Sequence, residues 1–262
     1  MAEPLDTGRP HPARVYDYLL GGKDNFAVDR AAAAEGLEVN PNAATAPLEN
    51  RAFMRRVVRY LAGEAGISQF LDIGTGLPTS PNVHESAQAV NPAARIVYVD
   101  NDPIVLTHAR ALLTSAPEGR TAYVDAAVQQ ADQILRAPGV RDNLDTRKPV
   151  AVLLMAILHF IPDDDAYDII PSIMDALPSG SYVALSHVTA DHDPDGWAKF
   201  TAVMRRQGLE SHLRGRAGVE RFFDRLELVE PGVVPILSWR PDGATDLTDA
   251  QVALYGGVAR KR

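Results

Sequence analysis

Apolar positions in the first part of the chain recur every three to four residues, which is the spacing of amphipathic helices. In the longest of these patterns Phe53, Val57 and Leu61 fall on one face. Gly21 and Gly22 directly follow the first pattern, and glycine commonly ends a helix. The helices predicted in this part cover residues 13–20, 27–39 and 47–62.

From residue 67 onward the pattern changes to short apolar runs that alternate with helical segments. Such alternation predicts a largely parallel sheet that is covered by helices on both faces. The run 150–158 is apolar at every position, which indicates a central strand buried on both sides. The predicted strands cover residues 67–73, 95–100, 121–125, 150–158, 181–187, 226–234 and 252–260. The predicted helices between them include residues 129–136, 163–177 and 197–207.

These two patterns divide the chain into two expected parts. Residues 1–66 form an N-terminal tail and a helical cap, and residues 67–262 form one α/β domain with a seven-stranded, mostly parallel, Rossmann-like sheet. Ligands of such sheets bind outside the carboxyl ends of the strands. We therefore expect the cap to lie beside a ligand cleft at that edge.

Charge and composition narrow the classes of function. The 262 residues carry a formal net charge of −8 and include no cysteine, which excludes disulfides, thiolate catalysis and cysteine-ligated zinc. The acidic balance argues against broad binding to nucleic acid or to anionic membranes. Residues 1–12 lack the apolar core of a signal peptide, and the run 150–158 is too short to span a bilayer. We expect a cytoplasmic protein, and a homodimer from the general frequency of two-fold assemblies.

The first strand leads directly into Gly74-Thr75-Gly76. Glycine tolerates positive φ and lets a ligand approach the backbone, so this turn is either a ligand-binding βα turn or an ordinary tight turn. A dinucleotide fingerprint requires Gly or Ala three residues after the second glycine, where this chain has Thr79. The chain also lacks a Tyr-x-x-x-Lys pair, which disfavours a nicotinamide oxidoreductase. With Asp72 ahead of the glycines, the turn resembles the Asp-x-Gly-x-Gly motif of S-adenosylmethionine (SAM)-dependent methyltransferases.

Three stretches resemble a bacterial family, found mainly in actinomycetes, that is called the S-adenosyl methyltransferase family. They are residues 13–26 (ARVYDYLLGGKDNF), residues 50–56 (NRAFMRR) and residues 70–79 (FLDIGTGLPT). The likeness runs from about residue 10 to the C-terminus. It implies a class I methyltransferase fold, with SAM as cofactor and S-adenosylhomocysteine (SAH) as product.

Acidic residues stand at the ends of three predicted strands, at Asp72, Asp100 and Asp125. A carboxylate at the end of the second strand suits the two ribose hydroxyls of such a cofactor, whereas Asp100 would otherwise cap a helix, a role that Asp102 already fills. Asp125 and the backbone of Ala126 suit the adenine ring. The expected cofactor site comprises Asp72, Gly74, Thr75, Gly76, Asp100, Asn101, Asp125, Ala126 and Ala156.

The exit of the fourth strand, residues 156–160, resembles the corresponding motif of small-molecule methyltransferases. His159 is the candidate catalytic residue: it is a general base, a group that shapes the acceptor site, or a structural histidine at a strand end. His187, Asp191, His192 and Asp193 are the one cluster with metal-ligand chemistry, but aspartates ahead of Pro194 commonly begin a helix. We therefore expect no metal.

The loop after the first helix holds a polar cluster that ends in an aromatic residue. It is either a solvated turn or a lid over the ligand. The expected substrate and lid residues are Tyr16, Tyr18, Lys23, Asp24, Asn25 and Phe26. The function we expect is methyl transfer from SAM to a small-molecule acceptor. The alternatives are a regulatory protein that binds SAM or SAH without transfer and, less favoured, an NAD(P)-dependent oxidoreductase.

Overall fold

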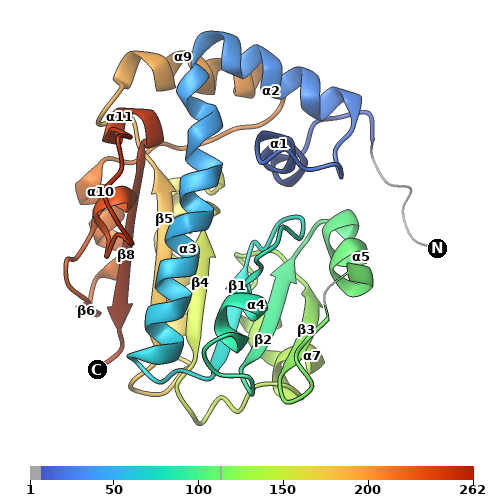
Figure 1. The fold of residues 1–262 in the computed structure, drawn as a ribbon, viewed down its shortest axis with the longest axis vertical. Coiled ribbons are helices and arrows are strands. Elements are labelled where there is room, and N and C mark those ends of the chain that lie inside the picture. Colours follow the sequence, from blue (N-terminus) through green and yellow to red (C-terminus); the bar gives the residue numbers. More distant parts are fainter. Residues whose placement is uncertain (1–6, 113) are drawn as a thin grey trace.

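A computed structural model describes residues 7–112 and 114–262 of the chain; residues 1–6, which begin the expected tail, lie outside the described part. Across the described residues, strands form one mixed sheet in the order β3-β2-β1-β4-β5-β8-β6, with β7 paired to β8 (Figure 1). The strands are β1 (Gln69–Ile73), β2 (Arg95–Asp100), β3 (Arg120–Asp125), β4 (Ala151–Met155), β5 (Tyr182–Val188), β6 (Glu227–Leu228), β7 (Val234–Pro235) and β8 (Leu254–Arg260). This arrangement confirms the expected α/β fold with a mostly parallel sheet.

The first five strands are parallel, so their carboxyl ends share one edge of the sheet. β1 is central: Leu71 pairs with Val97 on one side and with Val152 on the other. β8 runs antiparallel to β5 and closes the far side. The strand order changes direction between β1 and β4, and the crevice outside such a reversal is where ligands of open α/β sheets bind.

Helices cover both faces. One face carries the long helix α3, whose Phe53, Val57 and Leu61 are fully buried in a cluster with Phe70 of β1 and Leu153 of β4. The opposite face carries α6 and α8 among others. The helices are α1 (Pro12–Leu19), α2 (Ala27–Val39), α3 (Thr45–Gly63), α4 (Val83–Gln88), α5 (Pro103–Leu112), α6 (Ala131–Arg136), α7 (Pro138–Arg141), α8 (Asp163–Met174), α9 (Pro194–Arg206), α10 (Arg216–Glu220) and α11 (Asp249–Val252). The 3-10 turns are η1 (Pro41–Ala44), η2 (Leu158–Phe160), η3 (Arg221–Phe223) and η4 (Ile236–Ser238).

A helical cap lies over the carboxyl edge of the sheet, and its elements come from two distant parts of the sequence. α1 and α2 come from the expected cap region, but α9 packs along α2 as its third helix (Figure 1). The contact is close: a Cβ added to Gly36 of α2 would lie 2.7 Å from both Phe200 and Met204 of α9. α3, also within residues 1–66, packs on the sheet instead.

Two predicted strands differ from the pattern by more than two residues at an end. The strand expected over 150–158 ends at Met155, because Ala156 takes a positive φ of 53° and η2 follows. The strand expected over 226–234 is divided into β6 and β7. The turn between them includes Gly232 at φ 85°, whose N–H bonds to the Val229 carbonyl. The strand prediction was wrong at both places because the pattern of apolar residues does not show where the backbone turns.

Candidate functional site

A cavity of about 390 Å³ lies between the cap and the carboxyl ends of the parallel strands. Its size falls in the usual range for small-molecule sites. Of the residues expected from the sequence, those that line it are Tyr16, Asp72, Gly74, Thr75, Gly76, Asp100, Asn101, Ala126, Ala156 and His159. The structure thus brings together the turn, two of the three strand-end carboxylates and the candidate catalytic histidine.

The two glycines of the turn have different surroundings. Both adopt positive φ, 73° at Gly74 and 67° at Gly76. A Cβ on Gly74 would lie 2.6 Å from the side chain of Ile157, so this glycine lets β1 and the β4 exit approach each other. A Cβ on Gly76 would meet no atom within 4 Å. The bare face of Gly76 therefore borders open space in the cavity, as a backbone cradle for a ligand requires.

Asp100 connects the turn to the next strand end. Its two carboxylate oxygens accept hydrogen bonds from the Gly76 and Asp102 amides, each at 2.9 Å. Burial raises the pKa of Asp100, and those two amide bonds oppose the shift. A carboxylate has further acceptor sites for a ligand's hydroxyls. Asp102 accepts from the amide of Ile104 at 2.8 Å, so its predicted capping role is confirmed.

Asp72 is buried below the turn. Burial raises the pKa of Asp72 from 3.8 to about 7, and the positive charge of Arg51 and a hydrogen bond from Thr75 oppose this rise. The free protein thus holds a carboxyl group that is close to half protonated at neutral pH. A cation placed beside it would favour the ionised form, so Asp72 suits a positively charged part of a ligand.

A chain of hydrogen bonds joins the cap to the exit of β4, and sequence reasoning missed its central member, Asn50. Asn50 donates to the Tyr16 hydroxyl at 2.9 Å and accepts from Ser186 at 2.5 Å. Ser186 in turn accepts from the amide of Ala156 at 2.9 Å. The one available signal was that Asn50 opens the NRAFMRR stretch, whose resemblance to the family does not by itself assign a role to Asn50.

Arg51, the next residue, was also missed as a site residue. It lines the cavity and donates to the Pro81 carbonyl at 2.6 Å and to the Thr79 carbonyl. It therefore holds the loop that follows the glycine turn while placing a cation near Asp72.

Ala156 and His159 form the wall of the cavity at the exit of β4. A positive φ at a non-glycine residue costs free energy and often marks a functional site. His159, three residues on, is 7% exposed, and its Nδ1 has no hydrogen-bond partner within the described chain. Burial, with additional repulsion from His187 and Arg214, lowers the pKa of His159 well below its ordinary value. His159 is therefore a neutral imidazole at physiological pH.

Arg214 holds this wall in place. Its guanidinium donates to the carbonyls of Leu158 and Ile161, which flank His159, at 3.0 and 2.8 Å. It also lies 2.8 Å from His187 Nε2, while His187 Nδ1 lies 2.7 Å from the Val188 carbonyl. Because a carbonyl only accepts and a guanidinium only donates, His187 is neutral with its proton on Nδ1. No sequence motif pointed to Arg214.

The structure does not bring every expected residue to the cavity. Asp125, at the end of the edge strand β3, has an exposed side chain and is absent from the lining, whereas the adjacent Ala126 lines the cavity. Lys23 is exposed, and Tyr18 packs within the cap. Asp24 and Asn25 instead bond to Asp17, through the Asp24 amide at 2.9 Å and the Asn25 side chain at 2.8 Å.

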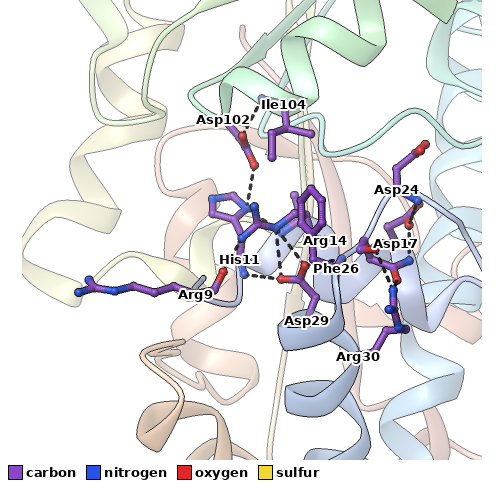
Figure 2. A network of polar contacts seen from close by, with 12 residues as sticks. Arg9, His11, Arg14, Asp17, Asp24, Phe26, Asp29, Arg30, Asp102 and Ile104 are labelled. Atoms are coloured by element: carbon purple, nitrogen blue, oxygen red, sulfur yellow. Dashed lines mark hydrogen bonds and ion pairs between the residues drawn. The ribbon is translucent and has the colours of Figure 1, made fainter. Parts of the chain in front are cut away.

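The loop at residues 23–26 and the start of α1 join the cap to α5. Figure 2 shows the network, in which His11 Nδ1 lies 3.1 Å from Asp102 and Arg14 pairs with the buried Asp29 at 3.2 Å. Asp24 pairs with His108 of α5 at 3.3 Å. Phe26 packs against a buried cluster of Leu77, Ile104 and Val105. The cap thus rests on α5 through two histidine–carboxylate pairs, one with the buried Asp102, and one apolar contact.

The described residues offer neither a cluster of metal ligands nor a membrane-spanning helix. No group of three or more His, Cys, Asp or Glu side chains in that part of the chain could hold a metal ion. In the same part, no helix combines the length and hydrophobicity needed to cross a membrane. Asp193, from the cluster with metal-ligand chemistry, instead caps α9 by accepting from the Gly196 amide at 3.0 Å.

Comparison with known proteins identifies the family. A model described as S-adenosyl methyltransferase matches residues 1–262. Similar solved structures include a DUF574 family protein from Streptomyces avermitilis MA-4680, 48% identical over 99% of this chain and 100% of that chain, with a TM-score of 0.96. Another is a proposed methyltransferase from Thermobifida fusca YX, 43% identical over 98% of this chain and 97% of that chain, with a TM-score of 0.91.

A more distant likeness concerns the fold alone. The plantazolicin methyltransferase BpumL, solved with SAH, is 10% identical over 95% of each chain, with a TM-score of 0.53. A search of curated proteins gave no match. The expected Rossmann-like methyltransferase fold is confirmed, and the chain belongs to the S-adenosyl methyltransferase family of SAM-dependent enzymes.

Proposed function

We propose that this enzyme binds SAM across the glycine turn and the ends of β1 and β2, and methylates a small molecule enclosed under the cap. The observation that carries the proposal is the cavity itself. It is bordered by the open face of Gly76 and by two buried carboxylates, Asp72 and Asp100, and the cap covers it.

Each part of the cofactor has a complementary group. Asp100 accepts hydrogen bonds from the ribose hydroxyls with the acceptor sites that the Gly76 and Asp102 amides leave free. Asp72 faces the positively charged methionine end and becomes ionised there. Ala126 and Asn101 line the part of the cavity that we assign to adenine and ribose. Asp125 contacts the cofactor only if its exposed side chain turns inward.

The bound cofactor supplies an electrophilic methyl group, which forms a bond to the acceptor's lone pair as the carbon–sulfur electron pair moves to sulfur. The protein aligns the acceptor and excludes water. His159, a weak base, takes a proton only from a group that has become strongly acidic. A hydroxyl becomes strongly acidic while its oxygen bonds to the methyl carbon, so His159 can accept that proton late and release it to solvent once the products leave.

The cap must open for ligands to enter and leave. Its contacts with α5 suit this, because the pairs His11–Asp102 and Asp24–His108 each include a partly exposed histidine. Such pairs contribute about 0–1 kcal/mol each. Residues 23–26 thus act as a support that closes the cap onto α5, whereas Tyr16 faces the ligands.

A thermal-shift comparison of SAH with NAD tests the cofactor. Saturation with SAH at a hundred times its Kd stabilises the native state by ~2.7 kcal/mol and raises Tm. NAD leaves Tm unchanged. Stabilisation by NAD alone would overturn the proposal. Transfer of a labelled methyl group from SAM into a small-molecule extract then separates an active enzyme from a binding protein without transfer.

The acceptor class, the cellular location and the oligomeric state of the enzyme belong to the same proposal. The cavity volume of about 390 Å³ and the net charge of −8 support a small acceptor over nucleic acid. We place the enzyme in the cytoplasm as a homodimer, the commonest symmetric assembly. Light scattering coupled to size-exclusion chromatography checks the dimer.

A further inference from the structure

The cavity has a second end that the cofactor groups do not reach. Its wall is formed within the cap, where α1 faces α9 and the segment that follows α9. The wall residues are Val15, Leu19, Trp197, Phe200, Met204 and Leu213. These belong to two apolar clusters, one between α1, α2 and α9 and the other around Ala43 and Trp197.

Charge is confined to the cofactor end. Among the described residues that line the cavity, the acidic and basic ones other than histidine are Arg51, Asp72 and Asp100. Asp72 lies in β1 just before the glycine turn, Asp100 ends β2, and Arg51 donates to the loop that follows the turn. An ion placed against the apolar wall would lose its hydration without gaining a partner, which costs several kcal/mol.

Polar groups at the apolar end are few and uncharged. Trp197 Nε1 and His159 Nδ1 are buried atoms that have no hydrogen-bond partner within the described chain. Both residues line the cavity and are more than nine-tenths buried. Neither ring adds a charge to this end of the cavity, because the indole is uncharged and burial lowers the pKa of His159.

We propose that the acceptor is an uncharged molecule with an aromatic or similarly apolar body, held against α9, and with one hydroxyl or amine nucleophile beside His159. The inference rests on the proposed function and specifies its substrate class. The nucleophile's lone pair forms the new bond to the methyl carbon, the sulfur keeps the carbon–sulfur pair, and the nucleophile's proton leaves through His159.

The test uses the full-length protein saturated with SAH and three probes with one ring system: naphthol, naphthoate and naphthylmethylammonium. Calorimetry is expected to show naphthol binding at least about 10-fold more tightly than either ion, a difference of ~1.4 kcal/mol. Equal binding of the three probes, tighter binding of an ion, or no naphthol binding to protein that still binds SAH would overturn the proposal. Loss of SAH binding itself would instead contradict the proposed function.

A matched pair of variants isolates charge from shape. Leu213 is half-buried on the wall and contacts the Trp197 cluster. Leu213→Glu is expected to weaken naphthol binding about 10-fold and to strengthen naphthylmethylammonium binding. Leu213→Gln introduces a side chain of the same shape as glutamate without the charge, and it should weaken naphthol binding about 3-fold or less. Both variants should retain wild-type SAH affinity, which also shows that they fold. Identical probe affinities for the Glu and Gln variants contradict an apolar, uncharged site.

Discussion

The two ends of the cavity are built differently. The end to which we assign the cofactor has backbone turns and carboxylates from β1 and β2, which lie within residues 69–100 and are held by a regular parallel sheet. The end to which we assign the acceptor is an apolar wall assembled from residues 12–19 and 194–213, segments about 180 positions apart in the sequence. One end is polar and local in sequence; the other is apolar and depends on long-range packing.

This difference has a physical reason. Groups that are common to every reaction of the enzyme, such as ribose hydroxyls and a sulfonium, need fixed polar partners, and strand ends supply these at defined positions. An acceptor with an apolar body needs shape and exclusion of water, which helices can provide through many small contacts. We therefore expect changes at the cofactor end to alter SAH affinity and pH dependence, and changes at the cap to alter rates and acceptor choice.

The largest effect concerns Asp72. Its pKa is raised in the native state, so its unfavourable contribution is absent below pH 3.8 and grows as the pH rises to about 7. At about 1.4 kcal/mol per unit, the ionised group lowers the free energy of unfolding by up to ~4 kcal/mol above pH 7. Asp72→Asn is therefore expected to raise Tm of the free protein at pH 8 but not at pH 4, and to bind SAM weakly.

The same carboxyl group predicts the pH dependence of binding. Because a cationic ligand group binds the ionised form, wild-type SAM affinity should fall as the pH drops below about 7. Asp72→Asn should remove that dependence. Calorimetry between pH 5.5 and 8.5 measures it, and a flat wild-type profile would show that Asp72 does not face the cation.

The two glycines form the next comparison. Gly74→Ala meets both a positive φ and the side chain of Ile157, whereas Gly76→Ala meets the same φ in open space. Urea unfolding is expected to show a loss of ~3 kcal/mol for Gly74→Ala and ~1 kcal/mol for Gly76→Ala. Gly76→Ala should lose SAH affinity although it remains folded, because its methyl group enters the cradle. Equal stability losses would mean that Ile157 yields to the added methyl.

Asp100 and Asp125 compare an inner with an edge strand end. Asp100→Asn is expected to weaken SAH binding about 30-fold, or ~2 kcal/mol, because hydrogen bonds to a carboxylate are lost. Asp125→Asn, at an exposed position, serves as the matched control and should change affinity less than about 3-fold. A large loss for Asp125→Asn would restore this residue to the site as the sequence predicted.

The smallest effect concerns the support of the cap. Asp24→Asn removes the ion pair with His108 and should accelerate SAH release about 2- to 5-fold, since a half-exposed pair is worth about 1 kcal/mol or less. Stopped-flow fluorescence measures the release rate. Asp242→Asn, which removes the exposed pair with Arg59, is the control and should leave the rate unchanged. Equal release rates for the wild type and both variants would show that the pair of Asp24 with His108 does not control closure of the cap.

That the glycine turn and two strand-end carboxylates line one cavity could be predicted because their signals are local. Gly74, Gly76 and Asp100 stand at positions where chain direction and strand order alone determine their surroundings. Asp125 showed the limit of this reasoning: it pairs with Asp100 in the sheet, yet its side chain is exposed and only its neighbour Ala126 lines the cavity. Periodicity likewise extended β4 past Met155, since apolar residues continue through the turn at Ala156.

The sequence by itself determined the fold class, the glycine turn and the acidic strand ends, because alternating apolar runs and turn residues act over a few neighbouring positions. Only the tertiary structure decided that α9 joins the cap, that Asn50 and Ser186 connect Tyr16 to Ala156, and that Arg214 supports the wall of His159. These contacts join residues 30 to 168 positions apart, and their partners are selected by packing of the whole chain rather than by any local pattern.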